Sequence, residues 1–174
     1  MKNSKTKIIL FAILVIAVTS THISWTEDEF GLLLTVDERP VDVRGLVENQ
    51  FNRFMRNCDS VQLLNKADIR FQLAEKLINE YSPPHSEQAD VAGVWEYENW
   101  LMVEVEFKKL EPVALLIENT DKVPRIVPSS VWSGYTSPRK SGPFIRHYIR
   151  QRIEDPPTNL LQCFEPRSQS FTIN

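Results

Sequence analysis

The sequence predicts an α+β fold, in which two N-terminal helices pack on a three- to four-stranded antiparallel meander and a Pro-rich C-terminal segment adds one short helix. Three observations predict this fold. Apolar residues first recur at three- and four-residue steps, they then alternate with polar residues, and seven of the eleven prolines lie at or beyond residue 124. Helical patterns followed by consecutive strands are typical of helices packed on one face of an antiparallel sheet.

Two helices are expected before the meander. The first covers about 42–57, and its apolar face consists of Val43, Leu46, Val47, Phe51, Phe54 and Met55. The second begins near Asn65 or Lys66, with Asn65 as its N-cap, and ends at Tyr81 before two prolines. A short buried strand at 30–36 precedes both helices, and residues 82–92 are predicted to form an exposed loop.

The clearest strand is expected at 101–107. Apolar Leu101, Val103, Val105 and Phe107 alternate there with Met102, Glu104, Glu106 and Lys108, which predicts a half-buried strand with one solvated face. Further strands are predicted at 93–97, at 113–118 and, as an edge strand, at 123–127. One short helix is predicted at 144–153, within an extended C-terminal segment that starts near residue 128.

Residues 1–20 have the composition of a secretory signal peptide. Lys2, Lys5 and Lys7 precede an eleven-residue apolar run at 8–18, and cleavage is predicted after Ser20. The run would span about 16 Å as a helix, roughly half of a bilayer core. The alternative, which stays open, is an uncleaved anchor that extends to Trp25. The remaining 26–174 are predicted to form a single exported domain that is periplasmic or extracellular, or anchored at the inner membrane.

The two cysteines, Cys58 and Cys163, predict one disulfide, because an exported chain with an even, low cysteine count favours pairing. The bridge would tie the C-terminal tail to the end of the first helix. The alternative is two separate buried thiols. No Cys-x-x-Cys motif occurs, so neither residue is predicted to be catalytic.

Charge is distributed unevenly along the chain. The formal net charge is −3, and it becomes −6 without residues 1–20, yet the stretch 123–153 holds six basic residues and no acidic one. This predicts a binding site for a partner protein or an anionic envelope component within Trp132–Arg152. The proposed site residues are Trp132, Tyr135, Arg139, Lys140, Arg146, Arg150 and Arg152. The alternative is that this segment folds back on the acidic strands between Glu96 and Glu106.

No motif in the sequence indicates catalysis, a metal or a cofactor. Histidine pairs with metal-ligand spacing, a Gly-x-Ser-x-Gly elbow and phosphate-binding glycine loops are absent from the sequence, which holds five glycines. Glu104 and Glu106 share a strand face at a spacing that suits paired acid–base chemistry, but a solvated strand face is the favoured interpretation.

The sequence therefore predicts a non-enzymatic exported binding protein. Nucleic acid is not an expected partner of a net-acidic exported chain, and membrane contact is expected only through an uncleaved N-terminal segment. Two alternatives stay open. One is a small-ligand-binding module or minor enzyme with a pocket lined by Trp95, Trp100 and Phe107, and the other is a membrane-anchored subunit of an envelope secretion or conjugation assembly.

Overall fold

The computed structural model describes residues 8–13, 22–28, 31–56, 58–81, 86–119 and 124–172. It combines helices with antiparallel sheets, so the predicted α+β class is confirmed. The chain divides into two compact units, Met1–Val47 and Glu48–Asn174. Within the described residues, no helix combines the length and the hydropathy that crossing a membrane requires.

The first unit is built on a three-stranded antiparallel sheet in the order β1 (Ile23–Asp28), β2 (Gly31–Val36) and β3 (Arg39–Val41). Asp37 and Glu38 join β2 to β3 with φ values of 48° and 64°, the left-handed conformation that a two-residue hairpin turn requires. The predicted strand at 30–36 is thus found as β2, except Phe30, which lies outside the described residues. Ile23 and Trp25 belong to strand β1 and not to a continuation of the apolar helix.

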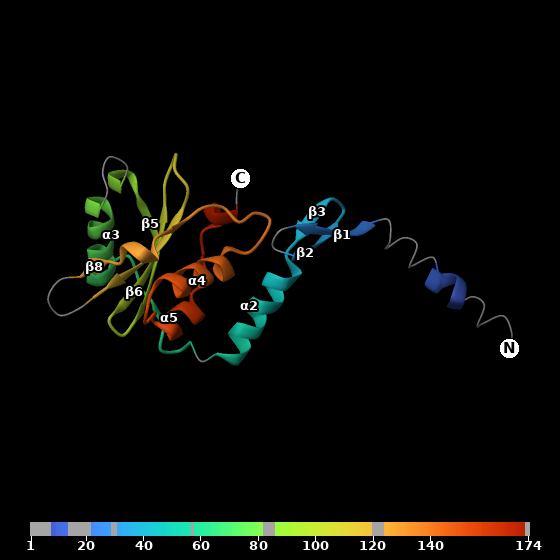
Figure 1. Cartoon of the computed structure of the whole chain (residues 1–174), viewed down its shortest axis with the longest axis horizontal. Coiled ribbons are helices and arrows are strands. Elements are labelled where there is room, and N and C mark those ends of the chain that lie inside the picture. The colour runs from blue at the N-terminus through green and yellow to red at the C-terminus, as the bar shows by residue number, and fades with distance from the viewer. Residues whose placement is uncertain are drawn as a thin grey trace. The chain divides into compact units, whose positions relative to one another are not determined.

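The second unit is organised around a six-stranded antiparallel sheet (Figure 1). Its order is β4 (Gln62–Leu63), β5 (Asp90–Tyr97), β6 (Trp100–Glu106), β7 (Val113–Glu118) and β8 (Arg125–Ile126), and β9 (Trp132–Ser133) also pairs with β7. The predicted meander is therefore confirmed as β5 to β8. Residues 82–85 of the predicted exposed loop over 82–92 lie outside the described residues. The prediction is wrong where β5 begins, at Asp90, because a bulge near Ala92 conceals the alternation.

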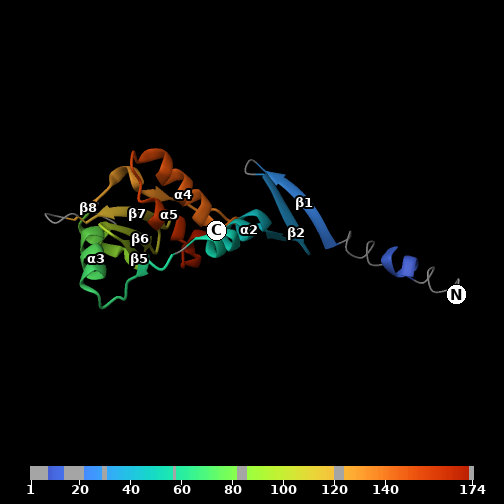
Figure 2. The same cartoon turned by 90° about the horizontal axis from the view of Figure 1, so that it is seen from below.

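Helices cover both faces of this sheet, which makes three layers (Figures 1 and 2). Helix α3 (Ile69–Tyr81) packs Phe71, Ala74 and Ile78 against one face. Helices α4 (Ser141–Arg152) and α5 (Thr158–Cys163) cover the opposite face with Ile145, Ile149, Leu160 and Leu161. The prediction that the helices pack on one face only is therefore wrong, because the C-terminal helices supply the second layer.

Strand β6 is consequently buried on both faces, and the prediction of a solvated face is wrong. Leu101, Val103 and Val105 lie in the core under α3, whereas Met102 lies in the core under α4 and α5. A polar residue in an alternating strand is exposed to solvent only if no later segment of the chain packs on that face of the sheet.

The predicted helix boundaries hold to within a few residues. Helix α2 (Val43–Met55) matches the prediction of 42–57, and α4 includes the predicted 144–153 except its last residue. Helix α3 begins after Asp68, whose Oδ1 accepts a hydrogen bond from the Arg70 N–H at 2.9 Å. Asn65 accepts one from Ala67 in the preceding turn, so Asp68 and not Asn65 is the N-cap.

Candidate functional site

The predicted basic site within Trp132–Arg152 is divided between the interior and the surface. Arg139 and Arg146 are buried, with 4% and 3% of their surface exposed. Lys140, Arg150 and Arg152 are exposed, and Arg152 lies over the Tyr148 ring at 4.2 Å. Trp132 is half-buried with its ring 5.7 Å from that of Phe171, and Tyr135 is exposed. The segment is therefore not one continuous basic surface.

Arg146 is held by the segment that follows α5. Its Nη1 donates to the Phe164 carbonyl oxygen at 2.9 Å and to Glu165 Oε1 at 2.5 Å. Its Nη2 lies 3.7 Å from Glu48 Oε1 and, within the part of the chain that the structure describes, makes no hydrogen bond, although this nitrogen is buried. The alternative prediction, in which this segment folds onto the acidic strands, is thus wrong for Arg146. Glu96, the first of those acidic residues, pairs with Arg70 instead.

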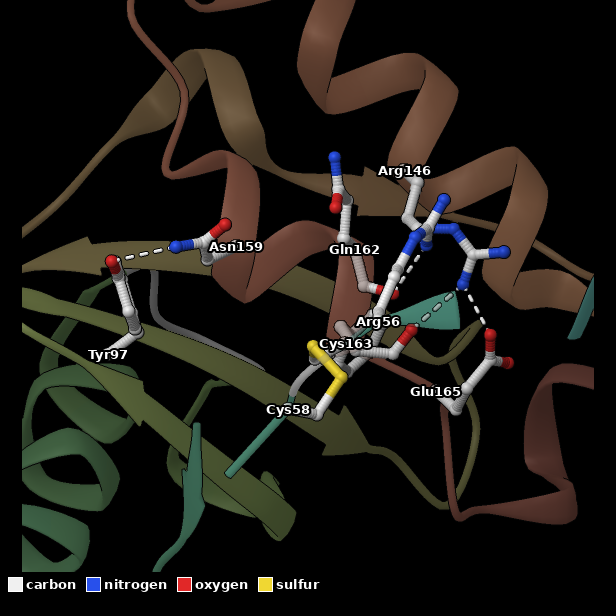
Figure 3. The surroundings of a disulfide bond; sticks show 9 residues. Arg56, Cys58, Tyr97, Arg146, Asn159, Gln162, Cys163 and Glu165 are labelled. Atoms are coloured by element: carbon white, nitrogen blue, oxygen red, sulfur yellow. Dashed lines mark hydrogen bonds and ion pairs between the residues drawn. A yellow bond between two sulfur atoms is a disulfide. The ribbon is translucent and has the colours of Figure 1, made fainter. Parts of the chain in front are cut away.

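A third arginine joins this region from the end of α2. Arg56 Nη1 donates to the Gln162 carbonyl oxygen at 2.7 Å, two residues before the carbonyl that Arg146 binds. Figure 3 shows the guanidinium groups of Arg56 and Arg146 together beside the disulfide. Burial lowers the pKa of Arg56, and the positive charges of Arg146 and Arg150 lower it further, against the carboxylates of Glu48 and Glu165. We call Arg56, Arg146 and Arg150 the arginine cluster.

The disulfide between Cys58 and Cys163 explains why Arg56 reaches this place. The predicted bridge is formed, with the Cα atoms 5.7 Å apart and the cysteines 105 positions apart in sequence (Figure 3). Sequence reasoning missed Arg56 as a site residue. A signal was available, because the predicted bridge alone brings a residue two positions before Cys58 close to the end of α5.

Helix α2 exposes the apolar face that the sequence predicted as a core face. In the part of α2 that belongs to the second unit, Phe51, Phe54 and Met55 expose 61%, 89% and 63% of their surface. The apolar residues of its first turns, Val43, Leu46 and Val47, are also exposed. The predicted packing of the apolar side of α2 on the sheet is not confirmed.

Two charged residues, one in α2 and one just after it, make contacts with the domain instead. Glu48 lies in α2 and faces Arg146, while Arg56, directly after the last helical residue, binds Gln162. These positions are eight residues apart, so at 100° per residue they lie within about 80° of each other around the helix. On the same count Phe51 and Phe54 lie about 60° and 120° from Glu48 on the side away from Arg56, and Met55 lies about 20° from Glu48 on that side. The amphipathic pattern was thus interpreted correctly as a helix and incorrectly as a core face. We call Phe51, Phe54 and Met55 the apolar face of α2.

Glu104 has a structural environment that the sequence did not reveal. Its side chain is fully buried and accepts hydrogen bonds from the backbone N–H groups of Ser168 at 2.7 Å and Arg167 at 3.2 Å. Glu106 on the same strand face receives the Ser168 hydroxyl. The two carboxylates hold the C-terminal segment to the sheet, so the predicted solvated face is wrong and Glu104 is enclosed by the chain itself.

The aromatic residues of the first meander strands do not line a common pocket. Trp95 is buried with its ring 4.8 Å from that of Phe164, and Trp100 packs on the same core. Phe107 packs on the core of the opposite sheet face. Trp100 and Phe107 are an odd number of residues apart, so one extended strand directs them to opposite faces. The predicted pocket lined by Trp95, Trp100 and Phe107 is therefore not formed.

Exposed apolar side chains thus lie on the same helix that reaches the arginine cluster. No protein-family model matches the chain, and no curated protein or solved structure shows significant similarity to it.

Proposed function

We propose that this chain is an exported, non-enzymatic protein that binds a partner protein of the cell envelope through the apolar face of α2. The observation that supports this proposal best is the exposure of Phe51, Phe54 and Met55, while Glu48 in the same helix and Arg56 directly after it contact the domain. Helices with a wide apolar stripe ordinarily bury it, and an exposed stripe is typical of an interaction surface.

The energetic argument favours a protein partner. Burying a phenylalanine or methionine side chain contributes about 1.5–3 kcal/mol, so three such residues offset an association cost of about 4 kcal/mol or more. A helix with exposed anchors at steps of three and four residues fits a complementary groove on another protein. Lys140, Arg150 and Arg152, the exposed basic members of the predicted site, would lie at the polar rim of such a contact or bind an anionic envelope component.

Export is supported by two independent features. The N-terminal composition fits a secretory signal, and the Cys58–Cys163 disulfide suits an oxidising compartment. On this proposal the protein works in the periplasm or outside the cell. It is released if cleavage follows Ser20, or it is a membrane-anchored assembly subunit if the segment stays attached. N-terminal sequencing of the protein recovered from cells tests this, because a start at Thr21 would exclude the anchored form.

Site-specific photocrosslinking tests the partner contact. A photoreactive benzoylphenylalanine in place of Phe54 should give one covalent adduct of defined mass in living cells. The adduct should be lost when Phe51→Ser and Met55→Ser are added. The matched control places the same photoreactive residue at Ile69, which is 74% exposed on α3 but lies outside the apolar face of α2.

Equal labelling at both positions, or no protein adduct at Phe54, would overturn the proposal. An adduct of twice the chain mass would identify a second copy as the partner and would replace a heterologous contact with a homodimer. A label found only on lipid would assign the apolar face to the membrane surface and would also contradict the proposal.

A further inference from the structure

The arginine cluster carries more positive charge than its own carboxylates neutralise. Arg56, Arg146 and Arg150 contribute three positive charges. Among the described residues, the carboxylates of Glu48 and Glu165 are the ones that act on Arg56 and pair with Arg146. Within this set of five residues, one positive charge is left over. Arg152 is not counted, because the cations that act on Arg56 are Arg146 and Arg150, while the Arg152 guanidinium lies over the Tyr148 ring.

The hydrogen bonding of the cluster is also incomplete. Arg146 is 3% exposed, and its Nη2 has no hydrogen-bond partner among the described residues, although a carboxylate oxygen of Glu48 lies 3.7 Å away. Buried guanidinium nitrogens are normally satisfied, so an orphaned one indicates an acceptor that is still to arrive or to move closer. Glu48 is 43% exposed in its side chain, which leaves it able to shift when another anion approaches.

The cluster borders the apolar face of α2. Glu48 precedes Phe51 by three residues, and Arg56 follows Met55 directly, so the same stretch of helix supplies anchors and charges. Protein interfaces commonly surround an apolar centre with a charged rim. A partner that covers Phe51, Phe54 and Met55 would therefore bring its own rim residues next to Arg56 and Arg150.

We propose that the arginine cluster is a carboxylate-binding site, which receives an aspartate or glutamate side chain that the partner carries beside its apolar contact residues. The inference rests on the proposed function, because the partner that covers the apolar face of α2 supplies the carboxylate. The leftover charge of one matches a singly charged carboxylate better than a phosphate dianion. The planar guanidinium fork also suits paired hydrogen bonds to a carboxylate.

The test uses small probes on the purified protein and so does not depend on the partner. Hexanoate joins a carboxylate to an apolar chain, hexanol keeps only the chain, and inorganic phosphate supplies a different oxyanion. Titration of each at constant ionic strength is followed by NMR of the arginine Nε–H signals. Hexanoate should shift Arg56 and Arg150 saturably, phosphate should bind more weakly, and hexanol should leave these signals unchanged.

Matched variants then locate the site. Arg150→Gln should weaken hexanoate binding about tenfold, the effect expected for the loss of a charge-assisted hydrogen bond. Arg152→Gln, two residues further on the same helix, should leave the affinity unchanged. Equal effects of the two variants, phosphate binding as tight as hexanoate binding, or a shift that never saturates would each overturn the inference.

The two proposals fail in different ways. If the crosslink from Phe54 forms but hexanoate does not bind, the partner contact stands and the carboxylate site is wrong. If hexanoate binds as expected but no Phe54 adduct forms in cells, the carboxylate has no protein partner at α2. The inference about the partner's acidic residue is then overturned together with the proposed function.

Discussion

Glu104 shows how a single buried acid affects the whole chain. It lies at the centre of β6 in a segment whose alternation favours a solvated face, yet none of its surface is exposed. Burial raises its pKa above the ordinary value of 4.5, and the hydrogen bonds from Ser168 and Arg167 partly oppose that shift. The folded protein therefore holds the Glu104 proton more tightly than the unfolded chain does.

The stability that depends on Glu104 should consequently fall as the pH rises. Below pH 4.5 the group is protonated in both states, and between 4.5 and the raised folded pKa only the unfolded chain loses the proton. The free energy of unfolding of the wild type, minus that of Glu104→Gln, should decrease through this range by up to about 1.4 kcal/mol per pH unit. Urea denaturation between pH 4 and 8 measures the difference.

A matched control for this prediction is Glu154→Gln, because Glu154 lies exposed after the end of α4. The difference between the wild type and Glu154→Gln should stay nearly constant over the same pH range. A Glu104→Gln difference that is flat or that rises with pH would show that the backbone hydrogen bonds outweigh burial.

At the scale of elements, amphipathic patterns located the helices but did not identify what each helix packs against. The apolar stripes of α2 and α4 look alike in sequence, but Ile145 and Ile149 of α4 are fully buried and Phe54 of α2 is almost fully exposed. Periodicity is a property of one segment, and burial depends on a second segment that the pattern does not contain. The arginines Arg146 and Arg150 differ in the same way, one buried and one exposed on the same helix.

Helix α5 was missed for a related reason. Six residues with two buried leucines are too short to show a period, and the helix is fixed by packing and by Cys163 at its end. Because the sequence does not predict α5, it also does not predict the second helical layer, the burial of Glu104 or the partners of Arg146. The disulfide, by contrast, could be predicted without tertiary information, from the even cysteine count of a chain expected to be exported.

Substitutions in these two helices should have opposite consequences. Ile149→Ala removes buried methyl and methylene groups and should lower the free energy of unfolding by about 2–5 kcal/mol. Phe54→Ser changes a side chain that is 89% exposed and should alter it by less than about 0.5 kcal/mol. Denaturant melts of the purified protein measure both.

The effects of these substitutions on the crosslink from residue 54 should be opposite to their effects on stability. A folded Ile149→Ala variant should keep the Phe54 crosslink in cells at a temperature below its melting point, whereas Phe51→Ser with Met55→Ser should lose it without loss of stability. A large destabilisation by Phe54→Ser would mean that the apolar face of α2 is already covered within the chain.

At the scale of the whole molecule, the two compact units differ in how much they bury. The described part of the first unit contains a single buried apolar side chain, Leu33, whereas the second unit holds two apolar cores on the two faces of its sheet. Small assemblies of strands rarely persist in water without a covered apolar face. The second unit, which also contains the disulfide, should therefore dominate the cooperative unfolding transition.

Removal of the disulfide should weaken that transition without abolishing the sheet. The bridge closes a long loop in the unfolded chain, since its cysteines are 105 positions apart, and chain entropy alone gives a loss of about 5 kcal/mol. Strain and residual structure usually reduce such values, so Cys58→Ser with Cys163→Ser should lower the free energy of unfolding by about 2–5 kcal/mol. Wild-type protein treated with reductant should match the double variant, because both lack the bridge and keep the same cores.

The double variant should also lose order around the arginine cluster first, because the bridge holds Arg56 beside Gln162. Hydrogen exchange would then rise at 56–63 before it rises in β6. Uniform exchange across both segments would show that the bridge stabilises the whole unit and not the local attachment of α2.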